Sequence, residues 1–140
     1  MTDLQNANLN LVDLIFFCLD HSIEVLTESR VSFVPFGISE TGGLRKLESL
    51  DFDDMDMPFV FRKQDLLPSE KQPDFFAYAS LGRLVLGTKD YHAVKIEAFD
   101  KAESIGHTIV QLYRPRRFFI PFKLLGDPVY LGSIENLLVS

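Results

Sequence analysis

The feature that most constrains the fold is a series of three apolar and aromatic segments in the second half of the chain. The segments are FFAYASLGRLVLG, YHAVKIEAF and HTIVQLY, and they are separated by GTKD and DKAESIG, which are rich in turn-forming residues. Strand-like segments joined by such stretches are typical of consecutive β-hairpins. The sequence therefore predicts a meandering antiparallel sheet.

Hairpins centred near residues 88 and 103 also predict which side chains share a face of the sheet. In this register His92 lies opposite Val85, and Val94 lies opposite Leu112, on a largely apolar face. The other face, called the mixed face here, combines aromatic and polar residues: Tyr78, Leu84, Leu86, Tyr91, Lys95, Glu97, Phe99, Ile109, Gln111 and Tyr113. It is too apolar for a freely exposed surface, so we expect residues 51–74, a second copy or another protein to cover it.

A helix is expected to lie on this sheet. Apolar residues recur at three- and four-residue steps from about Asn10 to Ser29. Asn8 or Asn10 can cap the helix by accepting from its first free amides. Because Phe16 and Phe17 fall outside a single apolar stripe, we expect the helix to be covered on more than one side.

The remaining segments complete an α+β fold. RVSFVPFGIS predicts a strand, which Pro35 places at a sheet edge or marks with a bulge, because proline has no N–H for the ladder. Thr41-Gly42-Gly43 predicts a hairpin turn. Residues 51–74, rich in proline and acidic side chains, are expected to form a flexible connection. We expect a single globular domain over residues 1–140, with the N-terminal helix packed on the sheet.

Near the C-terminal end, Pro115, Pro121 and Pro128 interrupt the apolar pattern. Because proline cannot donate to a ladder, these residues predict an irregular edge followed by a short strand near Val129–Leu131.

Composition narrows the classes of function. The formal net charge is −6 and the pI is about 5.0, so the overall field repels polyanions, and nucleic-acid binding is not expected. No basic residue precedes the apolar segment Leu11–Leu19, which is also too short to span a bilayer. These features predict a soluble cytoplasmic protein without membrane contact. The single cysteine, Cys18, lies in an apolar run and is interpreted as a small buried hydrophobe.

The sequence contains no strong catalytic or cofactor motif. A Gly-rich phosphate loop, CxxC and HExxH are all absent, and one cysteine with three scattered histidines cannot supply a structural zinc site. The acidic residues from Asp51 to Asp56 lack the glycine and glutamate of an EF-hand loop. We therefore expect no metal and no cofactor.

Three residues are the candidates for catalysis. His107 begins a predicted strand and is placed by the predicted register near Glu97, with Lys95 on the same face. A histidine with a carboxylate and an amine in one pocket can act as an acid or base, so a small hydrolase-like enzyme is the alternative to a binding protein. The simpler interpretation is that Lys95 and Glu97 form a surface ion pair.

The stretch RPRRFFIPF places Arg114, Arg116 and Arg117 among phenylalanines in an acidic chain. We interpret it as an intramolecular tether, and an anion site is the alternative. In the tether the arginines pair with surplus carboxylates and the aromatic rings anchor the segment to the core. The carboxylates and rings proposed are Asp127, Glu135, residues 51–56, Phe118 or Phe119, and Phe122.

The order SFVPFGI, TGGLRKL, FAYASLGRLVL, AVKIEAFD and IVQLYRPRR resembles small uncharacterised bacterial proteins in which a Val-Pro-Phe strand precedes an antiparallel sheet. The resemblance implies the same α+β fold and carries no activity. The sequence favours an interaction or regulatory protein over an enzyme, with a protein partner or a homodimer formed through the mixed face. The predicted binding residues are Tyr91, Phe99, Ile109, Tyr113, Arg114, Arg116 and Arg117.

Overall fold

The computed structural model describes residues 8–28, 33–49, 73–103, 105–117 and 119–135. Within these ranges the chain forms one helix and a seven-stranded antiparallel sheet, which confirms the predicted α+β class. The elements are α1 (Leu9–Thr27), β1 (Phe36–Thr41), β2 (Leu44–Ser49), β3 (Phe75–Leu86), β4 (Lys89–Asp100), β5 (Ile105–Arg114), β6 (Lys123–Leu124) and β7 (Val129–Glu135).

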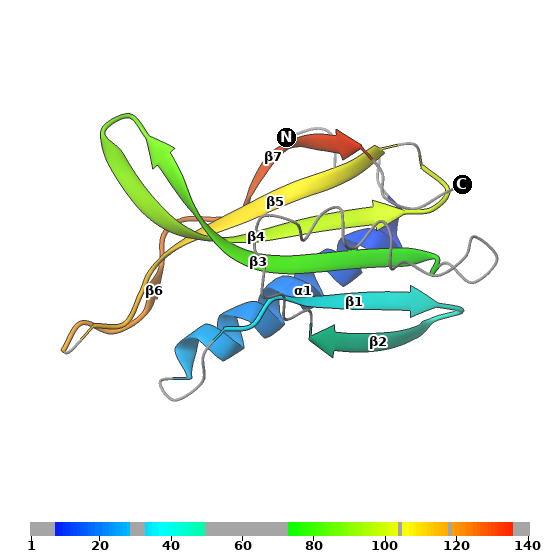
Figure 1. Ribbon diagram of the computed structural model, residues 1–140, viewed down its shortest axis with the longest axis horizontal. Coiled ribbons are helices and arrows are strands. Elements are labelled where there is room, and N and C mark those ends of the chain that lie inside the picture. Colours follow the sequence, from blue (N-terminus) through cyan, green and yellow to red (C-terminus); the bar gives the residue numbers. More distant parts are fainter. Residues whose placement is uncertain (1–7, 29–32, 50–72, 104, 118, 136–140) are drawn as a thin grey trace.

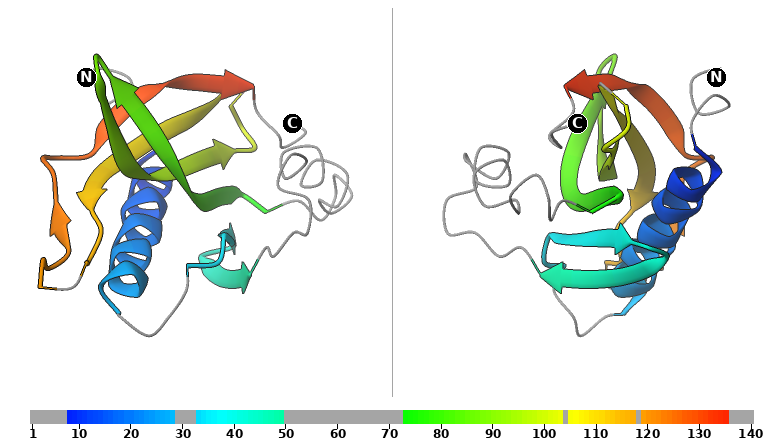
Figure 2. Two further views of the ribbon diagram at one scale, coloured as in Figure 1. Left: turned by 60° about the vertical axis from the view of Figure 1, so that its left-hand side comes forward. Right: turned by 90° about the vertical axis from the view of Figure 1, so that its right-hand side faces the viewer.

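The sheet has the strand order β2-β1-β3-β4-β5-β6, and β7 pairs with β5 on the same edge as β6. It is strongly curled, as Figure 2 shows, and α1 lies across one of its faces (Figure 1). The central strands β3 and β4 extend as a long hairpin beyond the residues that pair with β1 and β5. The turn end of the β3–β4 hairpin therefore projects from the sheet as a two-stranded segment.

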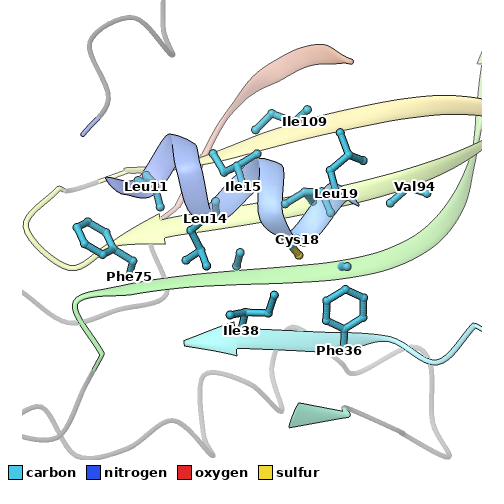
Figure 3. Packing of buried hydrophobic residues seen from close by; sticks show 14 of the residues in the cluster. Leu11, Leu14, Ile15, Cys18, Leu19, Phe36, Ile38, Phe75, Val94 and Ile109 are labelled. Carbon is cyan, nitrogen blue, oxygen red and sulfur yellow. The ribbon is translucent and has the colours of Figure 1, made fainter. Parts of the chain in front are cut away.

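Helix α1 packs on the sheet with the apolar stripe that its sequence predicts. Six of its residues are buried: Leu11, Leu14, Ile15, Cys18, Leu19 and Ser22. The apolar residues among them pack on β3 and β4 (Figure 3). The fully buried Ala77, Ala79 and Ala98 of these strands belong to the same cluster. Asn8 caps the helix, because its Oδ1 accepts from the amide of Asn10 at 2.8 Å. Within the described parts of the chain, no helix combines the length and apolar character needed to cross a membrane.

Arg45 of β2 ties the helix to the outer strands. Its Nε donates to Glu40 Oε1 at 2.8 Å and its Nη2 to Asp13 Oδ2 at 2.7 Å. The guanidinium also lies 4.9 Å from the ring centroid of Phe17. Phe17, which falls outside the apolar stripe, is thus partly covered by a cation that two carboxylates hold in place.

The predicted turn at Gly42-Gly43 is confirmed, and the predicted effect of Pro35 is wrong. Gly42 and Gly43 have φ of 58° and 84° and join β1 to β2 in a two-residue hairpin turn. Strand β1 begins only at Phe36, after the proline, and pairs with β2 on one side and β3 on the other. Because Pro35 precedes the ladder, it does not force β1 to an edge.

The predicted register of the β3–β4 hairpin is displaced by two residues. His92 lies opposite Arg83 rather than Val85, because Gly87 and Thr88 form the turn. A shift of two residues preserves the side to which every side chain points. The predicted faces of β3 and β4 are therefore kept.

The predicted register of β4 and β5 is wrong by one residue, which exchanges the two faces of β5. Val94 pairs with Gln111, not Leu112, and Ile96 pairs with Ile109. Ile109 and Tyr113 therefore lie on the face covered by α1, where both join the buried core. The mixed face does not form as predicted.

Contacts at the β4–β5 turn explain this register. Asp100 Oδ1 accepts from the amide of Ala102 at 2.9 Å, and Asp100 O accepts from the amide of Glu103 at 3.0 Å, which closes a tight turn. Gly106 lies beside the fully buried ring of Phe99. A Cβ at Gly106 would lie 2.5 Å from Phe99 Cδ1 and 2.9 Å from the carbonyl oxygen of Ala98. Glycine therefore permits the close approach that this pairing requires.

We predict that Gly106→Ala lowers the free energy of unfolding by about 1–3 kcal/mol, because a methyl group overpacks the contact with Phe99. Urea denaturation monitored by circular dichroism measures the effect. Gly82→Ala is the matched control, because a Cβ at that strand position meets nothing within 4 Å. Equal stability of the two variants would contradict the proposed role of Gly106.

Candidate functional site

Residues 113–117 and 119–124 form the two sides of a β-hairpin, called the basic hairpin here. Tyr113 pairs with Leu124, Arg114 with Lys123, and Arg117 with Ile120, all in one register. Arg117 and Ile120 exchange two backbone hydrogen bonds: the amide of Arg117 donates to Ile120 O at 2.9 Å and the amide of Ile120 donates to Arg117 O at 2.6 Å. The segment predicted to be an irregular edge is thus an ordered hairpin at one end of the sheet (Figures 1 and 2).

Two prolines shape the edges of the basic hairpin. Pro115 and Pro121 lie between the paired positions and have no N–H for cross-strand bonds. The carbonyl of Pro121 accepts from Arg114 Nη2 at 3.2 Å. Proline on an exposed edge also prevents another strand from adding to it.

Aromatic contacts fix the base of the basic hairpin to the sheet. The ring of the buried Tyr113 stacks on Phe122, with ring centroids 5.5 Å apart, and lies 5.7 Å from the ring of His92. Burial raises the pKa of the Tyr113 hydroxyl, against the opposing effect of the positive charge of Arg83. Phe122 also packs against the core cluster, so the predicted anchoring role of Phe122 is confirmed.

The tip of the basic hairpin is apolar and exposed. Phe119 has 99% of its surface exposed, and Ile120 has 50%. Phe119 therefore cannot be the anchor that the tether interpretation requires, and Phe118 lies outside the described residues. A fully exposed phenylalanine ring at the end of a projecting hairpin is unusual for a side chain that gains free energy on burial.

Four exposed cations lie along the basic hairpin, from its base to its tip: Arg114, Arg116, Arg117 and Lys123. Within the described residues none of the four forms an ion pair, so the predicted pairing of the arginines with Asp127 is wrong. The other proposed partners, the side chain of Glu135 and residues 51–56, lie outside the described part. Arg114 and Lys123 are directly opposite each other, and like charges in such a pair destabilise a hairpin.

The basic hairpin is the positive part of an acidic chain. Of the 14 basic residues four lie in the hairpin, and none of the 20 acidic residues does, so the remaining residues carry a formal net charge of −10. An anion is therefore attracted to the hairpin and repelled by the rest of the molecule.

The three candidate catalytic residues are not brought together. His107 lies opposite Ala98 and shares its side of the sheet, whereas Glu97, paired with Thr108, points to the other side. Lys95 shares the face of Glu97 but is exposed and forms no ion pair in the described region. The predicted Lys95–Glu97 ion pair is therefore wrong, and His107 has neither residue as a partner.

The partners of His107 are two residues that the sequence pattern does not predict. His107 is 3% exposed, and its Nδ1 shares a hydrogen bond of 3.0 Å with the hydroxyl of Tyr130 on β7. Its Nε2 lies 3.6 Å from Glu103 Oε1. The pairing of β5 with β7 creates this cluster, and no local pattern around His107 indicates it. The described residues contain no group of three or more potential metal ligands.

The predicted binding residues divide into exposed and buried groups. Arg114, Arg116 and Arg117 are exposed. The aromatic and aliphatic residues are less accessible to a binding partner. Phe99 is fully buried, Ile109 and Tyr113 belong to the core, and Tyr91 is half-buried.

We predict that Tyr130→Phe lowers the free energy of unfolding by about 1–3 kcal/mol, because His107 loses a hydrogen-bond partner in a buried site. Chemical denaturation of the two proteins measures the difference. Tyr91→Phe is the control, because Tyr91 is half-buried like Tyr130 but its hydroxyl makes no hydrogen bond within the described residues. Unchanged stability of Tyr130→Phe would show that the contact contributes nothing to folding.

Burial raises the pKa of the Cys18 thiol to about 12. We predict that Ellman's reagent does not react with the native protein between pH 7 and 9, because the nucleophilic thiolate is not formed there. Full reaction is expected after unfolding in guanidinium chloride. Rapid labelling of the folded protein would contradict the placement of Cys18 in the core.

Comparison with protein-family models, with curated proteins and with solved structures found no match to this chain.

Proposed function

We propose that the protein is a binding protein that holds an anionic partner with the basic hairpin. The observation that carries the proposal is the set of four exposed cations without a carboxylate partner among the described residues, beside the fully exposed ring of Phe119. The proposal keeps the expectation of a cytoplasmic interaction protein and moves the contact from the mixed face to residues 113–124.

The charge arrangement of the hairpin favours an anion as its ligand. Arg114 and Lys123 face each other across the two strands, so their charges repel in the free protein. An anion bound between them removes this repulsion and adds charge-assisted hydrogen bonds. Arg116 and Arg117 extend the positive surface toward the tip, and each guanidinium can bind a phosphate or carboxylate through two N–H groups.

The anchoring of the hairpin supports binding rather than a folding role for these cations. Tyr113 and Phe122 hold the base through buried aromatic contacts, and these contacts do not involve Arg116 or Arg117. Because the two arginines are exposed and unpaired within the described residues, their loss should leave the fold intact.

We predict that the protein is retained on a heparin column at low salt and that Arg116→Glu/Arg117→Glu elutes at a clearly lower salt concentration. The double variant reverses half of the charges on the basic hairpin and so weakens its attraction for a polyanion. The salt concentration at elution is the measurement. Circular dichroism and thermal denaturation check that the variant is folded.

Lys89→Glu/Lys95→Glu is the matched control, because it makes the same change in net charge at two exposed lysines outside the hairpin. We expect the control to elute close to the unmodified protein. Equal loss of retention in both double variants would show that net charge, rather than the basic hairpin, determines binding and would contradict the proposal.

A further inference from the structure

We infer that the anionic partner is the surface of a lipid bilayer, which the tip of the basic hairpin enters. The inference rests on the proposed function, because it names the partner of the same site. The contact is peripheral and needs no membrane-spanning helix, although the composition and the N-terminal sequence predict no membrane contact. An ionic partner explains the four cations of the hairpin, but the apolar tip requires a further explanation.

The tip combines the two kinds of side chain that bind an anionic bilayer. Phe119 is 99% exposed and Ile120 is 50% exposed, and Arg117 pairs with Ile120 at the first position behind the turn. Apolar side chains enter the boundary between headgroups and acyl chains, while arginine and lysine bind the phosphates above it. The apolar side chains at the tip can thus reach the boundary of the acyl chains, while the cations behind them remain at the level of the headgroup phosphates.

The length of the hairpin allows the tip to approach an anionic surface despite the acidic remainder of the chain. At about 3.3 Å per residue, Arg114 to Arg117 extend the hairpin about 13 Å beyond Tyr113. The Debye length at physiological ionic strength is about 8 Å. Repulsion between the bilayer and the acidic part of the protein is therefore strongly screened when the tip alone touches the surface.

A single-stranded nucleic acid fits this surface less well. Proteins that bind such strands combine a positively charged groove with several aromatic rings on which successive bases stack. In the described part of the basic hairpin, Phe119 is the one fully exposed ring, and the cations occupy a narrow projection. A polynucleotide that extends past this projection meets the acidic remainder, whereas a flat bilayer does not.

The absence of tryptophan from the chain permits a specific test. Phe119→Trp places the only tryptophan of the chain at the tip, and we expect its emission to shift to shorter wavelength on addition of vesicles that contain 30% phosphatidylserine. Vesicles of phosphatidylcholine alone should produce no shift. Leu44→Trp is the matched control, because Leu44 is 80% exposed beside the β1–β2 turn and should remain in water.

Co-sedimentation with the same vesicles measures affinity. Arg116→Glu/Arg117→Glu should reduce partitioning at least about 25-fold, since each cation near an anionic surface contributes about fivefold. Phe119→Ser should reduce vesicle partitioning about tenfold without changing retention on heparin. Leu44→Ser should change neither measurement.

The outcomes separate this inference from the proposed function. If the protein is retained on heparin but the Phe119→Trp emission does not shift, the proposal of an anionic partner stands and the inference that this partner is a bilayer is wrong. A single-stranded oligonucleotide that binds more tightly than the anionic vesicles, at the same salt concentration, would also overturn it. Loss of both heparin retention and vesicle binding would refute the proposed function itself.

Discussion

The fold depends on the close contact between the apolar stripe of α1 and a patch of small residues on the central strands. Ala77 and Ala79 of β3 and Ala98 of β4 are fully buried, and their short side chains let the helix approach the sheet backbone. Burial of apolar surface in this contact supplies the main driving force for folding. Strand β1 pairs with β3 on one side of this contact and β5 pairs with β4 on the other, and Arg45 adds a polar link between the helix and the outer strands.

Periodicity predicted the helix and most strands, but it could not predict the pairing of β4 with β5. A pattern of alternating residues is equally compatible with registers that differ by one position, and the choice between them exchanges the faces of a strand. Here the Asp100 turn and the contact of Phe99 with Gly106 determine that choice. Both are contacts between particular atoms, and hydrophobic periodicity does not reveal such contacts. For this reason periodicity places Ile109 on the wrong face.

The candidate site shows the same limit of prediction from sequence. The composition of RPRRFFIPF identified a basic and aromatic segment, but it could not show which ring is buried. Cross-strand pairing sends Phe122 inward beside Tyr113, whereas Phe119 lies at the turn and is exposed. The cluster of His107 with Tyr130 was equally hidden, because it forms only when β7 pairs with β5 across more than twenty residues of chain.

The basic hairpin separates the residues that hold it from the residues that can meet a partner. Tyr113 is a core residue and its ring stacks on Phe122, so the base of the hairpin is fixed by the same core that binds α1. Arg117 and Phe119, at the other end, contribute no contact to that core. A binding element that is held rigidly at its base loses less conformational entropy when a partner binds its tip. The folding core therefore favours binding without contacting the partner. Residues at the tip can be substituted to fit a partner without loss of core contacts.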